Sequence, residues 1–537
     1  MAGESHYDRC IDPLPPAEQL LHEIEALKKE LAKERALREH LEWKLRQLLA
    51  KHFGPSSEKI HPDQLQLFTE AVQAVIAEEA ASTATESEES ESASGVQDKE
   101  KQKQKPRGKR TSFPEVMREE IIEIDVPEEQ RVCPVTGVER KFVRWEESIK
   151  YNFVPGYFVR VIIRRAVRAA AAGADLCPEP IITAEMPPAY RIIPGAIAAC
   201  GLLVHLIVSK YCDHIPFYRT EQIFKRRYGV RLERQTMCHW MKRVCPHLQE
   251  LYDVLLYELR QGNYLQIDET WIRLMDPDVK GKTKKSYFWV IRHPKNGVLF
   301  WFDPSRSHRV AEELLGDFSG NLQVDGYCAY VSLSQKNPGL TLFGCWSHAR
   351  RKFFEAIDAN GPDAGWYMME IQKLYRVETE ARDAQMSAET RSALRLQQSQ
   401  PILASIKARL DADRNRASIL PSSPLGKAIE YTLGRWEALA RYAGTGNGEV
   451  EIDNNWVENA IRPTAIGKKN WLFIGHPNAG QQSAILYTII ENCRLNDIDP
   501  VEYLEDVLPR IQDHPKARIC ELLPRQWKAA REQRAAA

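Results

Sequence analysis

Two aspartates, each preceded by apolar residues typical of a strand, constrain the fold of this 537-residue chain more than any other feature. Asp268 lies in NYLQIDETWIRL (263–274), and Asp325 lies in GNLQVDGYCAY (320–330). Both segments predict β-strands. Burying a carboxylate in a strand costs free energy unless a cation or hydrogen bonds compensate for it. Either aspartate alone could be a turn or cap residue, but two in the same setting indicate a site.

The residues between the two aspartates predict the order of the surrounding elements. KSYFWVIRHP (285–294) and GVLFWFDPS (297–305) are typical of a second and a third strand, and HRVAEELLGDF (308–318) is typical of a helix. Three antiparallel-type strands, a helix and a fourth strand match the ribonuclease-H-like order. The predicted fold class is therefore α/β, an α+β mix built on a ribonuclease-H-like core.

A third acid lies in the segment EIDNNWVENAIRPTAIGKKNWLF (451–473). Asp453 and Asn454 can cap a helix that starts there. One face of this helix would be apolar and would pack on the core, whereas polar residues recur at three- and four-residue steps on the other face. The apolar residues are Val457, Ala460 and Ile461, and the polar ones are Asn455, Glu458, Asn459 and Arg462. Glu458 would then lie beside the two strand aspartates.

Three carboxylates around one cavity repel each other unless divalent cations lie between them. Mg²⁺ and Mn²⁺ prefer oxygen ligands, and two such ions about 4 Å apart suit an in-line phosphoryl displacement. We therefore predict that two Mg²⁺ or Mn²⁺ ions bind at Asp268, Asp325 and Glu458. Arg462 and the Lys468–Lys469 pair would face the phosphate backbone of a bound strand.

Residues 217–244, FYRTEQIFKRRYGVRLERQTMCHWMKRV, have the pattern of a helix-turn-helix. A first helix would end near Tyr228, Gly229 would supply the turn, and a second helix would run from about Glu233 to Val244. The second helix of this motif lies in the major groove of DNA. Its predicted base and phosphate contacts are Arg231, Arg234, Gln235, His239, Lys242 and Arg243. An ordinary helical hairpin is the alternative, but the cations on both helices favour DNA contact.

Residues 18–50 predict a short coiled coil, because apolar residues fill two positions of a seven-residue repeat. One position of the repeat holds Leu20, Leu27, Leu41 and Leu48, and the other holds Ile24, Leu31 and Leu45. Two charged residues, Glu34 and Arg38, interrupt this apolar stripe. We expect this helix to pair two chains, with packing on its own domain as the alternative. Residues 78–112 are acidic and serine-rich and then basic, which predicts a solvated linker. The alternative for KPRGKR within it is minor-groove contact.

A short cysteine pattern at residues 113–190 argues against a zinc site. Cys133 begins CPVT, where a zinc knuckle would have a second cysteine, and Cys177 is its nearby companion with no histidine between them. Two thiolates cannot supply the four ligands of a structural zinc. We therefore predict that no zinc binds here.

Composition limits where the chain works and how it can bind DNA. The formal net charge is zero, so binding to a polyanion must come from local clusters of cations. The eleven cysteines include no CxxC pair, which indicates reduced thiols. The opening MAGESHYDRC lacks a signal-peptide pattern, and no apolar run approaches the ~20 residues of a membrane span. We expect a cytoplasmic, nucleoid-associated protein without a membrane partner.

Over nearly its whole length the chain resembles the DDE transposases of the insertion-sequence-66 group, in particular their large subunit. The most specific block is IDNNWVENAIRPTAIGKKNWLFIGH (452–476). The other segments are FGPSSEKIHPDQLQLF (53–68), LLVHLIVSKYCDHIPFYRTEQIF, QIDET, VDGYCAY, CWSHARRKF, SPLGKAIEYTLGRWEAL and ELLPRQW. The resemblance implies that Asp268, Asp325 and Glu458 are the catalytic acids. We also count Arg350 and Arg351, in CWSHARRKF, among the expected DNA contacts.

The interval between Asp325 and Glu458 is too long for a bare ribonuclease-H core and has helical patterns, so we expect a helical insertion there. The predicted organisation has six parts. These are an N-terminal helical region with the zipper (1–77), a linker (78–112), a degenerate zinc-finger-like β region (113–190), a helix-turn-helix domain (191–250), a catalytic domain (251–475) with its insertion at about 352–445, and a C-terminal helical region (476–537).

The expected function is that of a transposase that binds the terminal inverted repeats of a bacterial insertion sequence. It would cleave and transfer DNA strands through the three acids and their metal ions. A nuclease or resolvase with the same core fits the zipper, the helix-turn-helix and the insertion poorly. A catalytically inactive DNA-binding relic or regulator is the alternative from another class, and a missing acid would have indicated it. Expected partners are element-end and target DNA, further copies of the chain, and small accessory proteins encoded by the same element.

Overall fold

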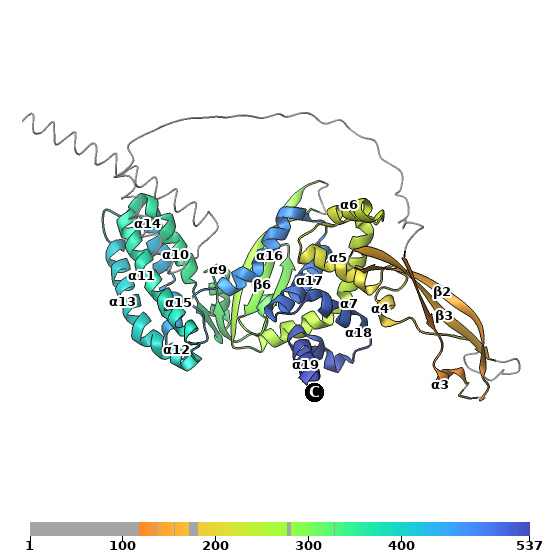
Figure 1. The fold of residues 1–537 in the computed structure, drawn as a ribbon. Coiled ribbons are helices and arrows are strands. Elements are labelled where there is room, and N and C mark those ends of the chain that lie inside the picture. The colour runs from red at the N-terminus through yellow and green to blue at the C-terminus, as the bar shows by residue number, and fades with distance from the viewer. Residues whose placement is uncertain are drawn as a thin grey trace, which may run out of the picture. The chain divides into compact units, whose positions relative to one another are not determined.

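The computed structural model describes residues 118–536 apart from 133, 136, 155, 171–180, 277–280 and 327. The chain divides into two units, Met1–Gln104 and Lys105–Ala537, and the described residues all lie in the second. The predicted coiled coil, the linker at 78–112, and both Cys133 and Cys177 therefore fall outside the described residues. Helices and two mixed sheets confirm the predicted α/β class (Figure 1).

The larger sheet has six strands in the order β7-β6-β5-β8-β9, with β10 paired to β5. Pairing is antiparallel between β5, β6 and β7, and parallel between β5, β8 and β9. Parallel neighbours need a crossover, and α8 and α9 supply it. The bounds are β5 (Tyr264–Met275), β6 (Thr283–His293), β7 (Gly297–Asp303), α8 (His308–Leu315), β8 (Gly320–Gln323), α9 (Cys328–Lys336), β9 (Leu340–Phe343) and β10 (Phe473–Ile474). The first three strands and the helix agree with their predicted positions.

The fourth strand is shorter than predicted, so the expectation that Asp325 lies within a strand is wrong. β8 ends at Gln323, and α9 begins at Cys328. The chain turns between them at Gly326, whose φ of 92° favours glycine. The apolar residues after the turn belong to the helix, where Tyr330 is fully buried. Asp325 therefore lies in the connection that follows the strand.

The helices before the sheet share one hydrophobic core with it. α6 (Phe217–Tyr228) ends at Gly229, whose φ of 68° allows the turn predicted there. The next helix, α7 (Arg234–Arg260), begins as predicted but does not stop near Val244. It continues because Leu248, Leu251 and Leu255 extend its buried stripe towards the sheet. The expected border between residues 250 and 251 therefore falls inside a single helix and a single core.

The remaining helices of this core complete its packing. α17 is buried along most of its length and contacts β7 and α7, while α16 contacts β5 and β6 (Figure 1). The bounds are α4 (Pro188–Arg191), α5 (Cys200–Tyr211), α16 (Asn455–Trp471), α17 (Pro477–Leu495), α18 (Pro500–Arg510), η3 (Lys516–Leu522) and α19 (Pro524–Ala536). Among the described residues, no helix is long and apolar enough to cross a membrane.

Between β9 and α16 the chain forms a group of helices with its own hydrophobic core. This group spans the interval in which an insertion is predicted, and it starts directly after β9. The bounds are α10 (Trp346–Glu355), α11 (Ile357–Asp383), α12 (Ala388–Leu394), the π-helix η1 (Arg395–Ser399), α13 (Gln400–Arg414), α14 (Pro424–Leu433), α15 (Trp436–Ala440) and η2 (Arg441–Ala443).

The smaller sheet contains the β-like runs predicted at residues 113–190. Its strand order is β1-β3-β2, with β4 paired to β3. β2 and β3 form a long antiparallel hairpin, whereas β1 runs parallel to β3. The bounds are β1 (Arg118–Ile124), α3 (Glu128–Arg131), β2 (Arg140–Val154), β3 (Tyr157–Ala170) and β4 (Ile181–Thr183).

Candidate active site

The three predicted acids come from separate parts of the chain, and two of them, Asp325 and Glu458, act electrostatically on the third, Asp268. Asp268 lies in the middle of β5, Asp325 lies two residues beyond β8, and Glu458 lies in the first turn of α16. Burial raises the pKa of the Asp268 carboxyl well above its usual range, and the neighbouring carboxylates of Glu269, Asp325 and Glu458 raise it further. The structure therefore brings the predicted acids into one neighbourhood in which like charges accumulate.

The register of the sheet explains why the two aspartates end up near each other. β5 and β8 are parallel, and their last paired residues are Gln266 and Gln323. Asp268 and Asp325 each follow two residues later along the chain. Because parallel strands point the same way, equal steps beyond one register pair bring both aspartates to the same end of the shared ladder.

The start of α16 differs in detail from the predicted cap. Asn454 is the N-cap residue, but its side chain makes no capping hydrogen bond. The buried Asp453 carboxylate instead accepts hydrogen bonds from the Asn455 backbone N–H at 3.1 Å and from the Tyr375 hydroxyl of α11 at 2.8 Å. A helix of the group between β9 and α16 therefore holds the segment that enters α16. The predicted apolar residues of α16, including Val457, are buried as expected.

A fourth acid, Glu269, lies beside the predicted three. Its side chain is only 1% exposed, and its carboxylate accepts hydrogen bonds from Arg306 Nε at 2.6 Å and from the Tyr330 hydroxyl at 2.9 Å. Burial raises the pKa of Glu269, while Arg306 acts to lower it. The sequence prediction missed this residue, and the signal that could have found it is the second acid of QIDET, directly after Asp268.

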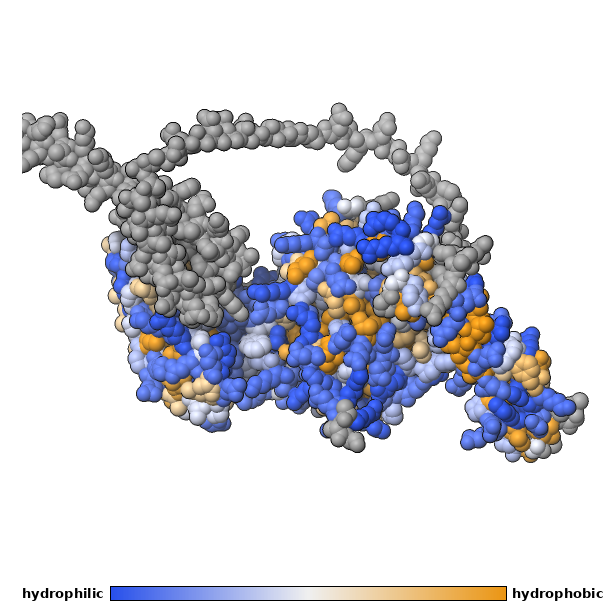
Figure 2. All heavy atoms as spheres, viewed as in Figure 1, coloured by the Kyte–Doolittle hydropathy of each residue, from blue (hydrophilic) through white to orange (hydrophobic). Residues whose placement is uncertain are grey.

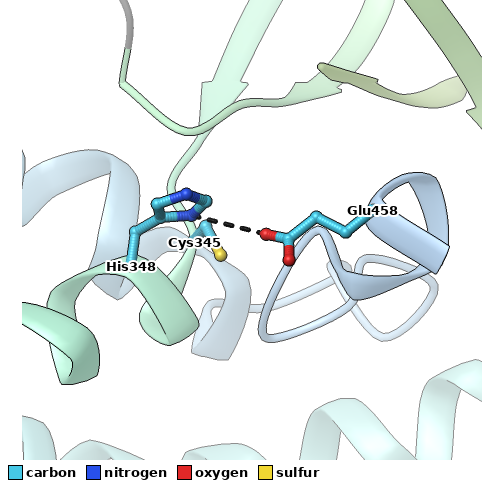
Figure 3. Close-up of side chains that lie close together, drawn as sticks. All are labelled: Cys345, His348 and Glu458. Atoms are coloured by element: carbon cyan, nitrogen blue, oxygen red, sulfur yellow. Dashed lines mark ion pairs between the residues drawn. The ribbon is translucent and has the colours of Figure 1, made fainter. Parts of the chain in front are cut away.

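Cys345 and His348, which had no predicted role, lie against Glu458. Figure 3 shows the imidazole of His348 facing the Glu458 carboxylate, with Cys345 beside them. His348 Nδ1 lies 3.7 Å from Glu458 Oε1, and the potential ligand atoms of all three residues lie within 4.8 Å of one another. In the part of the chain that the structure describes, the three acids do not lie as close together as this group. Burial raises the pKa of the Cys345 thiol well above its usual range, which favours the neutral thiol.

The predicted DNA contacts of the second helix lie along one exposed face at the start of α7, apart from Arg231, which lies in the turn before it. The exposed residues are Arg231, Arg234, Gln235, His239 and Lys242, and Arg243 is half-buried. The opposite face packs into the core through Met237, Trp240, Met241 and Val244. Hydrophilic residues also gather over α6 on the face drawn in Figure 2, where Lys225, Arg226 and Arg227 are exposed. The two helices together present a cationic surface.

The other predicted cations lie in different settings. Arg462 and Lys469 of α16 are exposed. Lys468 lies closer to the protein, because its Nζ donates to the Trp271 carbonyl at 3.2 Å and lies 4.4 Å from the centre of that ring. Burial lowers the pKa of Lys468, and Lys469 lowers it further. Of the pair, Lys469 is therefore the cation more available to a phosphate.

Arg350 and Arg351 are half-buried on α10, in the group of helices between β9 and α16. Arg351 acts electrostatically on Tyr431, whose hydroxyl donates to the Asp325 carbonyl at 2.7 Å. Arg350 acts on Tyr375, the residue that binds Asp453. Both arginines therefore lie near groups that hold the segments carrying acids.

Comparison with known proteins gives matches along most of the chain. Residues 195–482 match the family described as Transposase IS66 family, residues 488–525 match the IS66 C-terminal element, and residues 40–121 match Transposase C of IS166 homeodomain. The uncharacterised protein y4qI of Sinorhizobium fredii is 34% identical over 426 residues, which cover 76% of this chain and 75% of that protein. The uncharacterised protein y4jD of the same organism is 36% identical over 383 residues, covering 68% of this chain and 73% of that protein.

Proposed function

This chain belongs to the IS66 transposase family, and from that premise we propose that it cleaves and transfers DNA strands at the terminal inverted repeats of an insertion sequence. The proposed catalytic residues are Asp268, Asp325 and Glu458. The observation that carries the proposal is the geometry of the sheet: Asp268 and Asp325 each follow the last register pair of the parallel strands β5 and β8 by two residues, and α16, which carries Glu458, contacts β5. The strand order β7-β6-β5-β8-β9, antiparallel on one side of β5 and parallel on the other, supports a ribonuclease-H-like core.

The donor chemistry of the site fits hard divalent cations. Carboxylate oxygens are the ligands that Mg²⁺ and Mn²⁺ prefer, and a cation among them would offset the repulsion and burial that disfavour the charged form of Asp268. Asp268, Asp325 and Glu458 would hold two such ions. When bound, these ions supply Lewis-acid stabilisation of the attacking and leaving oxygens in phosphoryl displacement.

The other residues of the chain would bind and orient the DNA. The exposed donors at the start of α7, among them Arg234 and Gln235, would read base edges in the major groove. Arg462 and Lys469, exposed on the helix that carries Glu458, would hold phosphates of the strand being cut. Phosphate contacts fix register and base contacts give specificity, so the two surfaces divide these tasks.

Single substitutions of the acids test the proposal. Asp268→Asn, Asp325→Asn and Glu458→Gln should each lower cleavage of a labelled element end by at least about a hundredfold, as expected when charge stabilisation at a reaction centre is removed. Binding to the same end, measured by gel shift, should change little. A variant that retained near wild-type cleavage would remove that residue from the proposed site.

A further inference from the structure

A buried glutamine lies two residues before each candidate catalytic aspartate, Gln266 before Asp268 and Gln323 before Asp325. Gln266 and Gln323 are 0% exposed and are paired in the parallel register of β5 and β8. The Nε2 of Gln266 donates to Oε1 of Gln323 at 2.9 Å. A buried amide costs free energy unless its polar atoms are paired, so two of them in contact need defined partners.

The Nε2 of Gln266 also lies 3.0 Å from the Tyr264 hydroxyl of the same strand, and its other contacts lead to α16. Its Oε1 accepts a hydrogen bond from the Val457 backbone N–H at 3.1 Å, and its Nε2 donates to the Asp453 carbonyl at 3.0 Å. Val457 immediately precedes Glu458 and lies in the first turn, where helix N–H groups lack a full set of intrahelical partners. Gln266 of β5 therefore bonds to the backbone just before α16 and to the backbone of its first turn.

The contacts of Gln323 lead to two further segments. Its Nε2 donates to the Gly344 carbonyl at 3.0 Å and to the Glu451 carbonyl at 2.8 Å. Gly344 directly precedes Cys345 and α10, and Glu451 lies in the segment that enters α16. The Tyr264 hydroxyl donates to Gln323 Oε1 at 2.5 Å and accepts the Glu451 N–H at 3.1 Å, which completes the network.

We propose that Gln266 and Gln323 are positioning residues that fix the first turn of α16, and with it Glu458, relative to the ends of β5 and β8. Backbone partners set the orientation of both amides, because carbonyls face Nε2 of Gln323 and an N–H faces Oε1 of Gln266. The glutamines act through the backbone and not on the reacting phosphate. The catalytic consequence rests on the proposed function, whereas the mechanical link between strand and helix does not.

The chain offers a matched control for an amide that is merely structural. Asn492 of α17 is also buried and ties two elements together, since its Oδ1 accepts the Val298 N–H at 3.2 Å and its Nδ2 donates to the Val298 carbonyl at 2.6 Å. Asn492→Leu removes a buried amide bridge of the same kind between α17 and β7. It leaves the bonds between β5, β8 and α16 in place.

The experiment compares Gln266→Met, Gln323→Met, the milder Tyr264→Phe and the control Asn492→Leu in the full chain. Hydrogen exchange of the peptide 453–461 should become about tenfold faster in the two methionine variants, as expected for the loss of a buried hydrogen bond. The kcat for end cleavage should fall about tenfold or more, with the KM for DNA within about twofold, because these substitutions remove a supporting partner and leave the DNA-binding surface intact. Tyr264→Phe should show the same changes to a smaller extent, and it keeps the test usable if a methionine variant does not fold.

Wild-type protection of peptide 453–461 in folded Gln266→Met protein, or cleavage unchanged within about twofold, would overturn the positioning role. If Asn492→Leu produced the same exchange and the same fall in kcat, the effect would be general destabilisation and the proposal would also fail. If wild-type protein did not cleave an element end at all, the proposed function would fail. The exchange comparison would still decide whether the amides hold α16.

Discussion

At the scale of single residues, the site depends on how burial and neighbouring charge act on each side chain. Burial and three neighbouring carboxylates raise the pKa of Asp268. The Glu269 carboxylate, in contrast, accepts hydrogen bonds from Arg306 and Tyr330. These partners offset part of the cost of burying the Glu269 charge, although its pKa remains raised, whereas an external cation would offset the repulsion at Asp268. In the proposed site, Asp268 would therefore bind the ion and Glu269 would have a supporting role.

The cysteines provide a residue-scale prediction, because their settings differ. Cys238 is exposed among the predicted DNA contacts of α7, while burial raises the pKa of Cys345. Since the thiolate is the nucleophile, iodoacetamide at neutral pH should modify Cys238 and leave Cys345 unmodified. Added element-end DNA should protect Cys238. Peptide mass spectrometry measures both, and labelling of Cys238 that DNA does not slow would contradict the assignment of this face of α7.

A second residue-scale prediction separates positioning cations from base readers. Lys469→Ala should weaken binding to element ends and to random duplex alike, and should reduce the salt slope by about one. Arg234→Ala combined with Gln235→Ala should instead weaken element-end binding more than random binding, by about 1–3 kcal/mol for each base-edge interaction that the substitutions remove. Titrations at several salt concentrations measure both quantities. Equal loss of specificity in the two variants would rule out this division.

At the scale of elements, the group of helices between β9 and α16 braces the segment that enters α16. Arg395 of η1 is fully buried and donates to the carbonyls of Tyr442, Asn447 and Val450 at 2.9–3.0 Å. Its charge is paired with Glu378 of α11, which also accepts bonds from Arg391. This group of helices therefore helps to fix the backbone of residues 442–450, which leads into α16 and Glu458.

This buried ion group predicts a dependence of stability on pH. Burial acts to raise the pKa of Glu378, but the bonds from Arg395 and Arg391 outweigh it, so the pKa is lowered. Because the pKa is lower in the folded state, the Glu378 carboxylate stabilises the fold at pH values above its pKa in the unfolded chain, about 4.3 for glutamate. This stabilisation is lost as the pH falls through the pKa of the folded state. Thermal melts of wild type should therefore show a loss below about pH 4.

Glu378→Gln should lower the free energy of unfolding at pH 7 by about 3–5 kcal/mol, because it leaves a buried arginine without its counter-ion. The substitution should also make the loss of stability at low pH less steep. Glu430→Gln is the matched control, since Glu430 and Arg414 form a pair with side chains 45% and 55% exposed. That control should cost no more than about 1 kcal/mol. A Glu378→Gln melt equal to the control would contradict the bracing role of this group.

The elements also mark what the sequence could and could not predict. Hydrophobic periodicity and turn residues predicted β5, β6, β7, α6 and the start of α7, because those signals are local. The end of β8 and the end of α7 depend on packing against residues distant in the sequence, and the prediction placed both ends wrongly. Gln266 and Gln323 gave no signal, since a polar residue in a strand usually indicates an exposed position. Their partners lie on segments far away in the sequence.

At the scale of the whole molecule, the proposed DNA-reading helices and the proposed catalytic sheet share one hydrophobic core within Lys105–Ala537. Removing residues 1–77 should therefore leave this core folded and able to bind a single element end. Joining two ends should be impaired if the predicted zipper pairs chains. Light scattering and a paired-end gel assay measure this, and pairing at wild-type efficiency by the truncated chain would place dimerisation elsewhere.

The central claim is that Asp268, Asp325 and Glu458, from three separate elements, form one metal-dependent centre for DNA strand transfer. The most direct measurement is strand transfer by purified protein on a labelled element end, with Mg²⁺ and with EDTA, for wild type and Glu458→Gln. We predict joined product for wild type with Mg²⁺, none with EDTA, and none for Glu458→Gln although it binds the end normally. Joined product from Glu458→Gln, or from wild type in EDTA, would contradict the account.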